Sequence, residues 1–170
     1  TVANPIPDQN ATEDVAFNFQ FALNTFNDID VGDELTYTAE LSGGVPLPAW
    51  LAFDPLSRTF SGTPSNSDVG ELNIVVTATD LSDASVSDSF ILTVLNVNDP
   101  PTVANPIENQ NATQGVFFNF VVPVDTFEDI DGDELTYTAQ LAGGGPLPVW
   151  LSFDPDTRTF SGTPLNANVG

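Results

Sequence analysis

The stretch Gly32–Ala39 reads GDELTYTA, and the same residues return at Gly132–Ala139. Two more stretches repeat in the same way, TVANPI at Thr1–Ile6 and Thr102–Ile107, and RTFSGTP at Arg58–Pro64 and Arg158–Pro164. A repeat of about 100 residues is longer than the ~20–50 residues of a solenoid unit and has the size of one β-sandwich domain. The chain therefore contains two copies of one domain.

Within copy one, apolar and polar residues alternate with a period of two, which is typical of half-buried β-strands. No window has a helical period, and 14 prolines and 12 glycines separate the alternating segments. The pattern predicts strands at Val2–Ile6, Val15–Phe21, Leu35–Leu41, Trp50–Phe53, Arg58–Thr63, Leu72–Thr79 and Phe90–Val97, with a polar turn at Asp80–Ser87. We therefore predict an all-β fold of tandem seven-stranded β-sandwiches.

The junction between the copies is predicted near Asp99–Pro101, because two consecutive prolines hold the chain extended. This gives one repeat at residues 1–100 and a second at residues 101–170. Copy two stops at Gly170, the counterpart of Gly70, so the sequence holds no counterparts of its last two strands. We expect that either the protein continues beyond Gly170 or a neighbouring subunit supplies the two strands. Donation between subunits would be a head-to-tail contact that propagates into a fibre.

The composition is strongly acidic, with 24 carboxylates against two arginines and a net charge of −22. This charge excludes nucleic acid as a partner and disfavours anionic membrane surfaces. No apolar run approaches the ~20 residues of a membrane span, so no membrane insertion is predicted. Because such a charge is self-repulsive unless salt or divalent cations neutralise it, we expect an extracellular or cell-surface location.

The sequence contains no recognisable set of catalytic residues, because it has no His, Cys or Lys and no Ser beside a base. We predict that the chain is not an enzyme. The stretches Asn10-Ala11-Thr12 and Asn111-Ala112-Thr113 fit the glycosylation acceptor pattern, which makes Asn10 and Asn111 candidate modification sites.

Oxygen-bearing side chains that could bind calcium gather at a few places in the sequence. They are Glu13 before the Phe-rich strand, Asp28-Ile29-Asp30 followed by Gly32, Asp80 after Thr79, Asn98-Asp99 before the prolines, and Asp129-Ile130-Asp131 in copy two. The alternative at each place is a solvated acidic turn or an ordinary linker. An EF-hand is excluded because its twelfth position, which should be Glu, holds Ala39 in copy one and Gln140 in copy two.

In this order, the features of copy one resemble the cadherin family, and more closely its bacterial cadherin-like relatives of the dystroglycan type. The family pattern has an acidic residue near the first strand, a DxD-G loop, an A-x-D at the end of the sixth strand and an x-N-D-x-P linker. Pro46–Leu51 and Phe60–Pro64 also match these modules and related immunoglobulin-like ones. The resemblance covers copy one and the available part of copy two, and it implies Greek-key sandwiches of the cadherin or immunoglobulin type.

The resemblance also implies calcium ions held between consecutive domains. Its ligands would be Glu13, Asn98 and Asp99 from the first domain and Asp129 and Asp131 from the second, while Asp28, Asp30 and Asp80 would face a preceding domain. Copy two departs from the pattern, because Gln114 and Gly115 replace Glu13 and Asp14. A full calcium site after copy two is therefore not implied.

These observations together predict a calcium-binding extracellular structural repeat. It would act as a stiffened spacer or fibre unit of a surface adhesin, filament or matrix protein. Its partners would be neighbouring repeats of the same protein, or identical subunits in a fibre formed by strand donation. The alternative is a calcium-dependent polysaccharide-binding module. An exposed row of aromatic side chains would favour the polysaccharide-binding module, and aromatic side chains that all face inward would favour the spacer.

Overall fold

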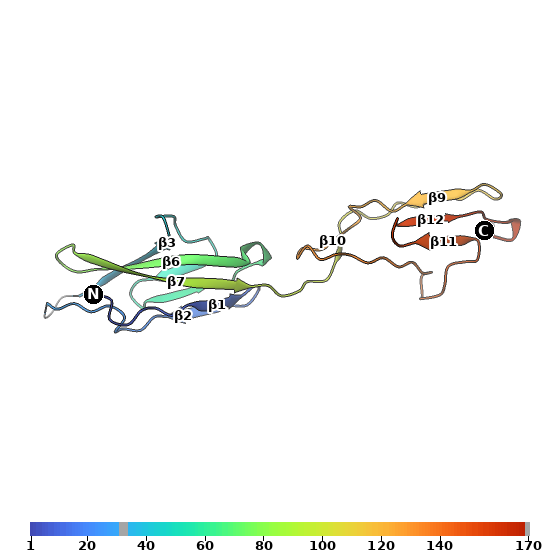
Figure 1. The fold of residues 1–170 in the computed structure, drawn as a ribbon. Helices are drawn as coiled ribbons and strands as arrows, with labels where there is room; N and C mark the ends of the chain where they lie inside the picture. The colour runs from blue at the N-terminus through green and yellow to red at the C-terminus, as the bar shows by residue number, and fades with distance from the viewer. Residues whose placement is uncertain (31–33, 169–170) are drawn as a thin grey trace. The chain divides into compact units, whose positions relative to one another are not determined.

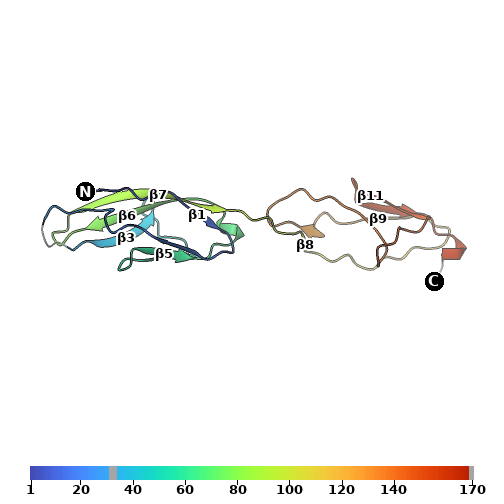
Figure 2. The same cartoon turned by 90° about the horizontal axis from the view of Figure 1, so that it is seen from below.

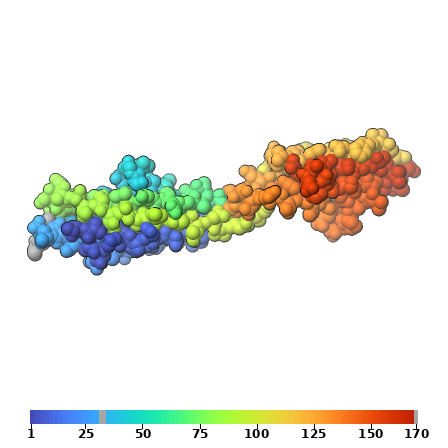
Figure 3. Space-filling model, in the orientation of Figure 1, coloured from blue at the N-terminus to red at the C-terminus, as the bar shows by residue number. Residues whose placement is uncertain are grey.

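The computed structural model describes residues 1–30 and 34–168 and divides the chain into two compact units. Unit 1 is Thr1–Asn98 and unit 2 is Asp99–Gly170. They are coloured from blue to yellow-green and from yellow to red in Figure 3. Gly32, the glycine of the predicted DxD-G loop in copy one, lies outside the described residues, as does Gly170.

Unit 1 is a sandwich of two sheets (Figures 1 and 2). The four-stranded sheet has the order β1-β7-β6-β3, and the three-stranded sheet has the order β2-β5-β4. The strands are β1 Gln9–Thr12, β2 Phe17–Gln20, β3 Thr36–Leu41, β4 Leu51–Asp54, β5 Thr59–Gly62, β6 Gly70–Thr79 and β7 Ser85–Leu95, with a 3₁₀ turn at Asn66–Asp68. The predicted all-β sandwich is confirmed.

The core of unit 1 lies between the two sheets and is built largely from phenylalanines. The ring of Phe90 on β7 lies 5.5 Å from the ring of Phe60 on β5 and 5.8 Å from that of Phe19 on β2. Phe60 is fully buried, and so are Ile74 and Leu92. Burying side chains of this size contributes about 1.5–3 kcal/mol each, so β6 and β7 supply a large part of the stability of unit 1.

Two predicted elements of copy one are wrong in detail. Val2–Ile6 is not a strand, because only Val2 forms an isolated bridge, to Phe26, and the nearby Pro5 and Pro7 lack an N–H for a ladder. The strand beside β7 is instead β1, which follows those prolines. The polar turn predicted at Asp80–Ser87 is also shorter, because β7 already begins at Ser85 and pairs with Thr79.

Strand direction decides which loops meet at each end of unit 1. β1 pairs in parallel with β7, with Thr12 opposite Leu95, so the residues after both strands emerge at the same end. β6 is antiparallel to β7, so the residues after β6 lie at the other end. The N-terminus also lies at that other end, where β7 begins (Figures 1 and 2).

Unit 2 repeats the three-stranded sheet of unit 1 with the same register. Its order is β11-β12-β9, and Phe118 faces Gly162 as Phe17 faces Gly62. The elements are β8 Thr102–Val103, β9 Phe118–Val121, β10 Phe127–Glu128, β11 Leu151–Asp154 and β12 Thr159–Gly162, with a 3₁₀ turn at Asn166–Asn168. Residues 99–168, the described part of unit 2, contain no counterparts of β6 and β7.

Candidate metal centre

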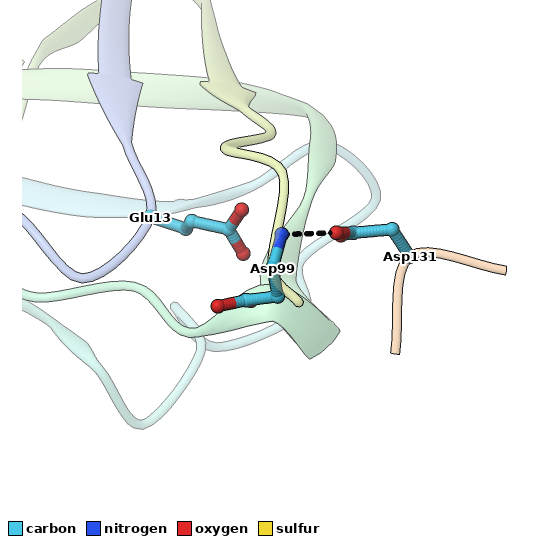
Figure 4. Close-up of side chains that lie close together, drawn as sticks. All are labelled: Glu13, Asp99 and Asp131. Atoms are coloured by element: carbon cyan, nitrogen blue, oxygen red, sulfur yellow. Dashed lines mark hydrogen bonds between the residues drawn. The ribbon is translucent and has the colours of Figure 1, made fainter. Parts of the chain in front are cut away.

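Glu13 is the most buried of the predicted ligands. It follows β1 in unit 1 (Figure 4) and is 1% exposed. Its backbone N–H donates to the Leu95 carbonyl at 3.1 Å, and its Oε1 accepts the Val97 N–H. Its other oxygen, Oε2, is buried and accepts no hydrogen bond from any described residue. The parallel pairing of β1 with β7 therefore holds one carboxylate oxygen against the segment after β7 and leaves the second without a donor.

In unit 2, the predicted ligand loop follows β10. β8 and β10 are antiparallel with Thr102 opposite Glu128, so the residues before β8 run alongside the residues after β10. Asp99 accordingly donates its N–H to Asp131 Oδ2 at 2.6 Å, the dashed line in Figure 4. Asp129 Oδ1 accepts the N–H groups of Asp131 at 3.0 Å and Asp133 at 3.3 Å, which closes the loop on itself.

The two hydrogen-bonded carboxylates are tied to one short stretch of chain. Val97 donates to Glu13 of unit 1, Asp99 donates to Asp131 of unit 2, and Asn98 is the residue between them. Two residues of extended chain span at most about 7 Å, so the two donor groups stay close in any arrangement of the units. Glu13 and Asp131 thus each accept a hydrogen bond from this stretch, one within each unit.

The remaining predicted ligands, Asp28, Asp30 and Asp80, belong to the other end of unit 1. Asp80 follows β6, and its Oδ1 accepts the N–H groups of Ser82 and Ala84 at 2.8 and 2.9 Å. Asp28 Oδ1 accepts the Asp30 N–H at 2.8 Å. Among the described residues these three carboxylates do not form a cluster of metal-binding size. Their role toward a preceding domain stays a prediction.

Both candidate glycosylation residues are exposed. Asn10 lies on β1 and Asn111 lies in the corresponding segment of unit 2. Their modification stays a prediction.

The backbone donors Val97 and Asp99 were not part of the sequence prediction. Every non-proline residue carries an N–H group, so nothing in the sequence distinguishes these two. Only the pairing of β1 with β7 and of β8 with β10 shows that they hold the carboxylates of Glu13 and Asp131.

A family model described as "Putative Ig domain" matches residues 1–95 and again residues 100–170. The chain belongs to this family. The two matches correspond to the two copies of the sequence repeat, and the family agrees with the β-sandwich of unit 1. The immunoglobulin-like part of the predicted resemblance is thereby confirmed.

Two curated relatives are similar over most of the chain. Axial budding pattern protein 2 of Saccharomyces cerevisiae is 26% identical, with 87% of this chain and 20% of the relative covered. The serine-rich adhesin for platelets of Staphylococcus aureus strain MRSA252 is 29% identical, with 71% of this chain and 8% of the relative covered. The chain thus spans a fifth or less of the length of these relatives. As predicted, it is an extracellular or cell-surface segment.

Solved structures give weaker likenesses. The endo-fucoidan hydrolase MfFcnA4 of glycoside hydrolase family 107 is 25% identical, with 99% of this chain and 24% of that chain covered, at a TM-score of 0.45. The ectodomain of human desmocollin-1 is 16% identical, with 94% and 32% covered, at a TM-score of 0.47. At these TM-scores neither likeness supports an argument about function. In the described part of the chain, no helix has the length and apolar character needed to cross a membrane.

Proposed function

We propose that the chain is a structural repeat of a surface adhesin or matrix protein in which calcium stiffens the junction between consecutive domains, as in the cadherin-like modules it resembles. Glu13, Asn98, Asp99, Asp129 and Asp131 supply the ligands. Neighbouring repeats of the same protein are the partners, and the role is mechanical rather than catalytic. Relatives that are adhesin-type proteins support the non-enzymatic part of the proposal.

The observation that carries the proposal is the second carboxylate oxygen of Glu13. A buried carboxylate is costly unless it is paired, hydrogen-bonded or bound to a metal. Glu13 is 1% exposed, yet its Oε2 accepts no hydrogen bond from the described residues. A calcium ion takes six to eight oxygen ligands and would supply the missing partner.

Charge supports the same conclusion. The chain has 24 carboxylates, and its only cationic side chains are Arg58 and Arg158. Two unscreened carboxylates about 4 Å apart repel by roughly 1–4 kcal/mol near a protein surface. A cation bound among the carboxylates of the junction would relieve such repulsion.

In unit 1 the orientation of the aromatic side chains favours the spacer over the polysaccharide-binding module, whereas in unit 2 Phe117 is 67% exposed. Every described aromatic side chain of unit 1 is buried or half-buried, including Trp50 and Tyr37. Their rings pack against one another in the core; Phe21, for example, lies 5.5 Å from Tyr37 and 6.2 Å from Phe53. A sugar platform needs exposed rings, and the described part of unit 1 offers none.

Calorimetric titration of calcium tests the proposal on four proteins: the full chain, Glu13→Gln, Asp131→Asn and Asp133→Asn. Glu13→Gln keeps the shape of the side chain and removes its charge, and we expect it to weaken calcium binding at least tenfold, which corresponds to about 1.4 kcal/mol. Asp131→Asn should have a similar effect.

Asp133→Asn is the matched control, because Asp133 donates its backbone N–H to Asp129 Oδ1 in the loop of unit 2 and the substitution leaves this donor in place. Its calcium affinity should stay within about threefold of the parent chain, a difference of about 0.7 kcal/mol. No binding by the parent chain, or equal losses in Asp131→Asn and Asp133→Asn, would contradict the assignment.

A further inference from the structure

In unit 1, the segment before β1 lies beside β7 without a backbone ladder. β1 pairs with β7 only over Gln9–Thr12, opposite Leu92–Leu95. The residues before β1 include Pro5 and Pro7, which have no N–H to donate to a ladder. Ile6, between the two prolines, is nevertheless 4% exposed, so this segment is held closely against the rest of unit 1. Bonds other than a ladder must therefore attach it.

Two carboxylates supply the hydrogen bonds where the ladder is missing. Asp88 on β7 accepts the N–H of Ile6 through Oδ2 at 2.7 Å. Asp8, just before β1, accepts the N–H of Ile91 on β7 through Oδ1 at 2.8 Å. Each segment thus offers one side chain to the backbone of the other. Together with the short ladder, these two bonds attach residues 6–12 to β7 as one continuous stretch.

The position of Asp88 is unusual for a charged side chain. Burial alternates along β7, and Asp88 lies on the same face as Phe90, which is 2% exposed. The residue opposite Asp88 on β6 is Val76, which is 0% exposed. A carboxylate on the core face of a strand is costly unless it is hydrogen-bonded. The bond from the Ile6 N–H supplies this partner, so Asp88 serves to attach the N-terminal segment.

The directions of β1 and β7 determine how this attachment responds to force. The N-terminus lies at the end of unit 1 where β7 begins, and the chain leaves β7 at the opposite end (Figures 1 and 2). Because β1 and β7 are parallel, a pull on both ends of unit 1 slides the two strands past each other along their length. The hydrogen bonds between residues 6–12 and β7 then bear the force together and do not break one at a time.

We propose that β1 and β7, joined by Asp8 and Asp88, form a clamp that bears force applied along unit 1. The two carboxylates extend the clamp across the interruption that Pro5 and Pro7 cause in the ladder. Hydrogen bonds to charged groups are stronger than neutral ones, so each of them strengthens the clamp more than one ladder bond does. The inference rests on the mechanical role in the proposed function but not on calcium. It is tested in chelator, so its failure and the failure of the calcium proposal are distinguishable.

The test is single-molecule unfolding of the full chain at constant force in the presence of a chelator. The chain has no cysteine, so Thr1→Cys with Pro101→Cys places the two attachment points on either side of unit 1. Thr1→Cys with Ser82→Cys is the matched geometry. Ser82 lies in the turn between β6 and β7, at the same end as the N-terminus, so this pull peels β1 from β7. At the same force, unfolding should be slower by a factor of about ten or more in the first geometry.

Two variants test the carboxylate bonds in the first geometry. Asp88→Ala removes the acceptor of the Ile6 N–H and should speed unfolding about tenfold, because the bonds of the clamp break in one step. In the second geometry its effect should be smaller. Asp68→Ala is the matched control, because Asp68 also accepts a backbone N–H, that of Ser65 at 2.9 Å, but lies outside the clamp. Its unfolding rate should stay within about threefold of the parent rate.

Equal unfolding rates in the two geometries would overturn the proposal, and this comparison needs no change in the clamp itself. Equal effects of Asp88→Ala and Asp68→Ala in the first geometry would also overturn it, because Asp88 would then contribute no more than a carboxylate outside the clamp. If Asp88→Ala speeds unfolding by the same factor in both geometries, Asp88 has only a general structural role, and the clamp is again contradicted.

Discussion

At the residue scale, Glu13 shows both the reach and the limit of sequence analysis. Its acidic type and its place before the Phe-rich strand were enough to predict a ligand. Its burial and its bond to the Val97 N–H were not predictable, because they depend on the parallel register of β1 with β7. Gln114 and Gly115 show the same limit. Gly115 has a φ of 71°, close to the 56° of Asp14, so copy two keeps the loop geometry although it changes the side chains.

Asp54 gives a prediction at the same scale. The hydroxyl of Ser57, at 2.7 Å, and the N–H of Leu56, at 3.0 Å, hold the pKa of this carboxyl below its ordinary value. Folding therefore favours the ionised form. The contribution to stability is fully present above the unfolded-state pKa of about 3.9 and is lost as the pH falls through the lower folded-state pKa.

We therefore expect Asp54→Ala to be less stable than the parent chain at pH 6 and equal to it once the pH is well below 3.9. Chemical unfolding of both proteins across this pH range measures the difference between their free energies of unfolding. Ser57→Ala, which removes the main donor, should reduce the pH-dependent difference. If the difference in unfolding free energy between the parent chain and Asp54→Ala does not change with pH, the ionised carboxylate is not the source of that difference.

At the element scale, the two copies show how much a strand depends on its partner. Residues 36–41 read TYTAEL and form β3, whereas residues 136–141 read TYTAQL and form no strand in the described structure. Burial still alternates in the second segment, with Tyr137 half-buried between exposed Thr136 and Thr138. The alternation of apolar and polar residues therefore determines which side chains are buried. Formation of a β-ladder also needs a partner strand equivalent to β6, which the described part of unit 2 does not contain.

β1 is the opposite case, a strand that the sequence did not predict. Its residues, Gln9–Thr12, read QNAT and include one apolar side chain, Ala11. With so short a segment there is no alternation to read, and the strand exists because β7 offers an edge for parallel pairing. The alternating strands of copy one were predicted because each carries its own apolar face.

Gly62 at the end of β5 gives a prediction for this scale. A Cβ atom there would lie 1.8 Å from the carbonyl oxygen of Trp50, which is backbone and cannot rotate away. We expect Gly62→Ala to destabilise unit 1 by about 3 kcal/mol, the upper end of the usual cost of overpacking. Urea unfolding in a Trp150→Phe background measures this, because Trp50 is then the remaining tryptophan and reports on unit 1.

Ser61→Ala, one residue earlier on β5, is the control and should change stability by no more than about 0.5 kcal/mol. Equal midpoints for Gly62→Ala and Ser61→Ala would contradict the close approach of β5 to the Trp50 backbone.

At the scale of the whole molecule, the sequence predicted the two copies and a junction near Asp99, and the structure divides the chain after Asn98. Both could be predicted because the repeat and the Pro-Pro pair can be recognised from the order of residues alone, without knowing which strands pair. The central claim is the proposed calcium at the junction: Glu13 of unit 1 accepts the N–H of Val97, Asp131 of unit 2 accepts the N–H of Asp99, and the net charge of −22 favours a bound cation.

The most direct measurement is the distance distribution between two spin labels, one on each unit. The chain has no cysteine, so Ala52→Cys and Ser152→Cys give a unique labelled pair on the exposed faces of β4 and β11. We predict a broad distribution in chelator that becomes narrow with calcium, and a distribution that stays broad with calcium in the Glu13→Gln variant. A distribution of the same width in chelator and in saturating calcium would contradict the claim that calcium stiffens the junction.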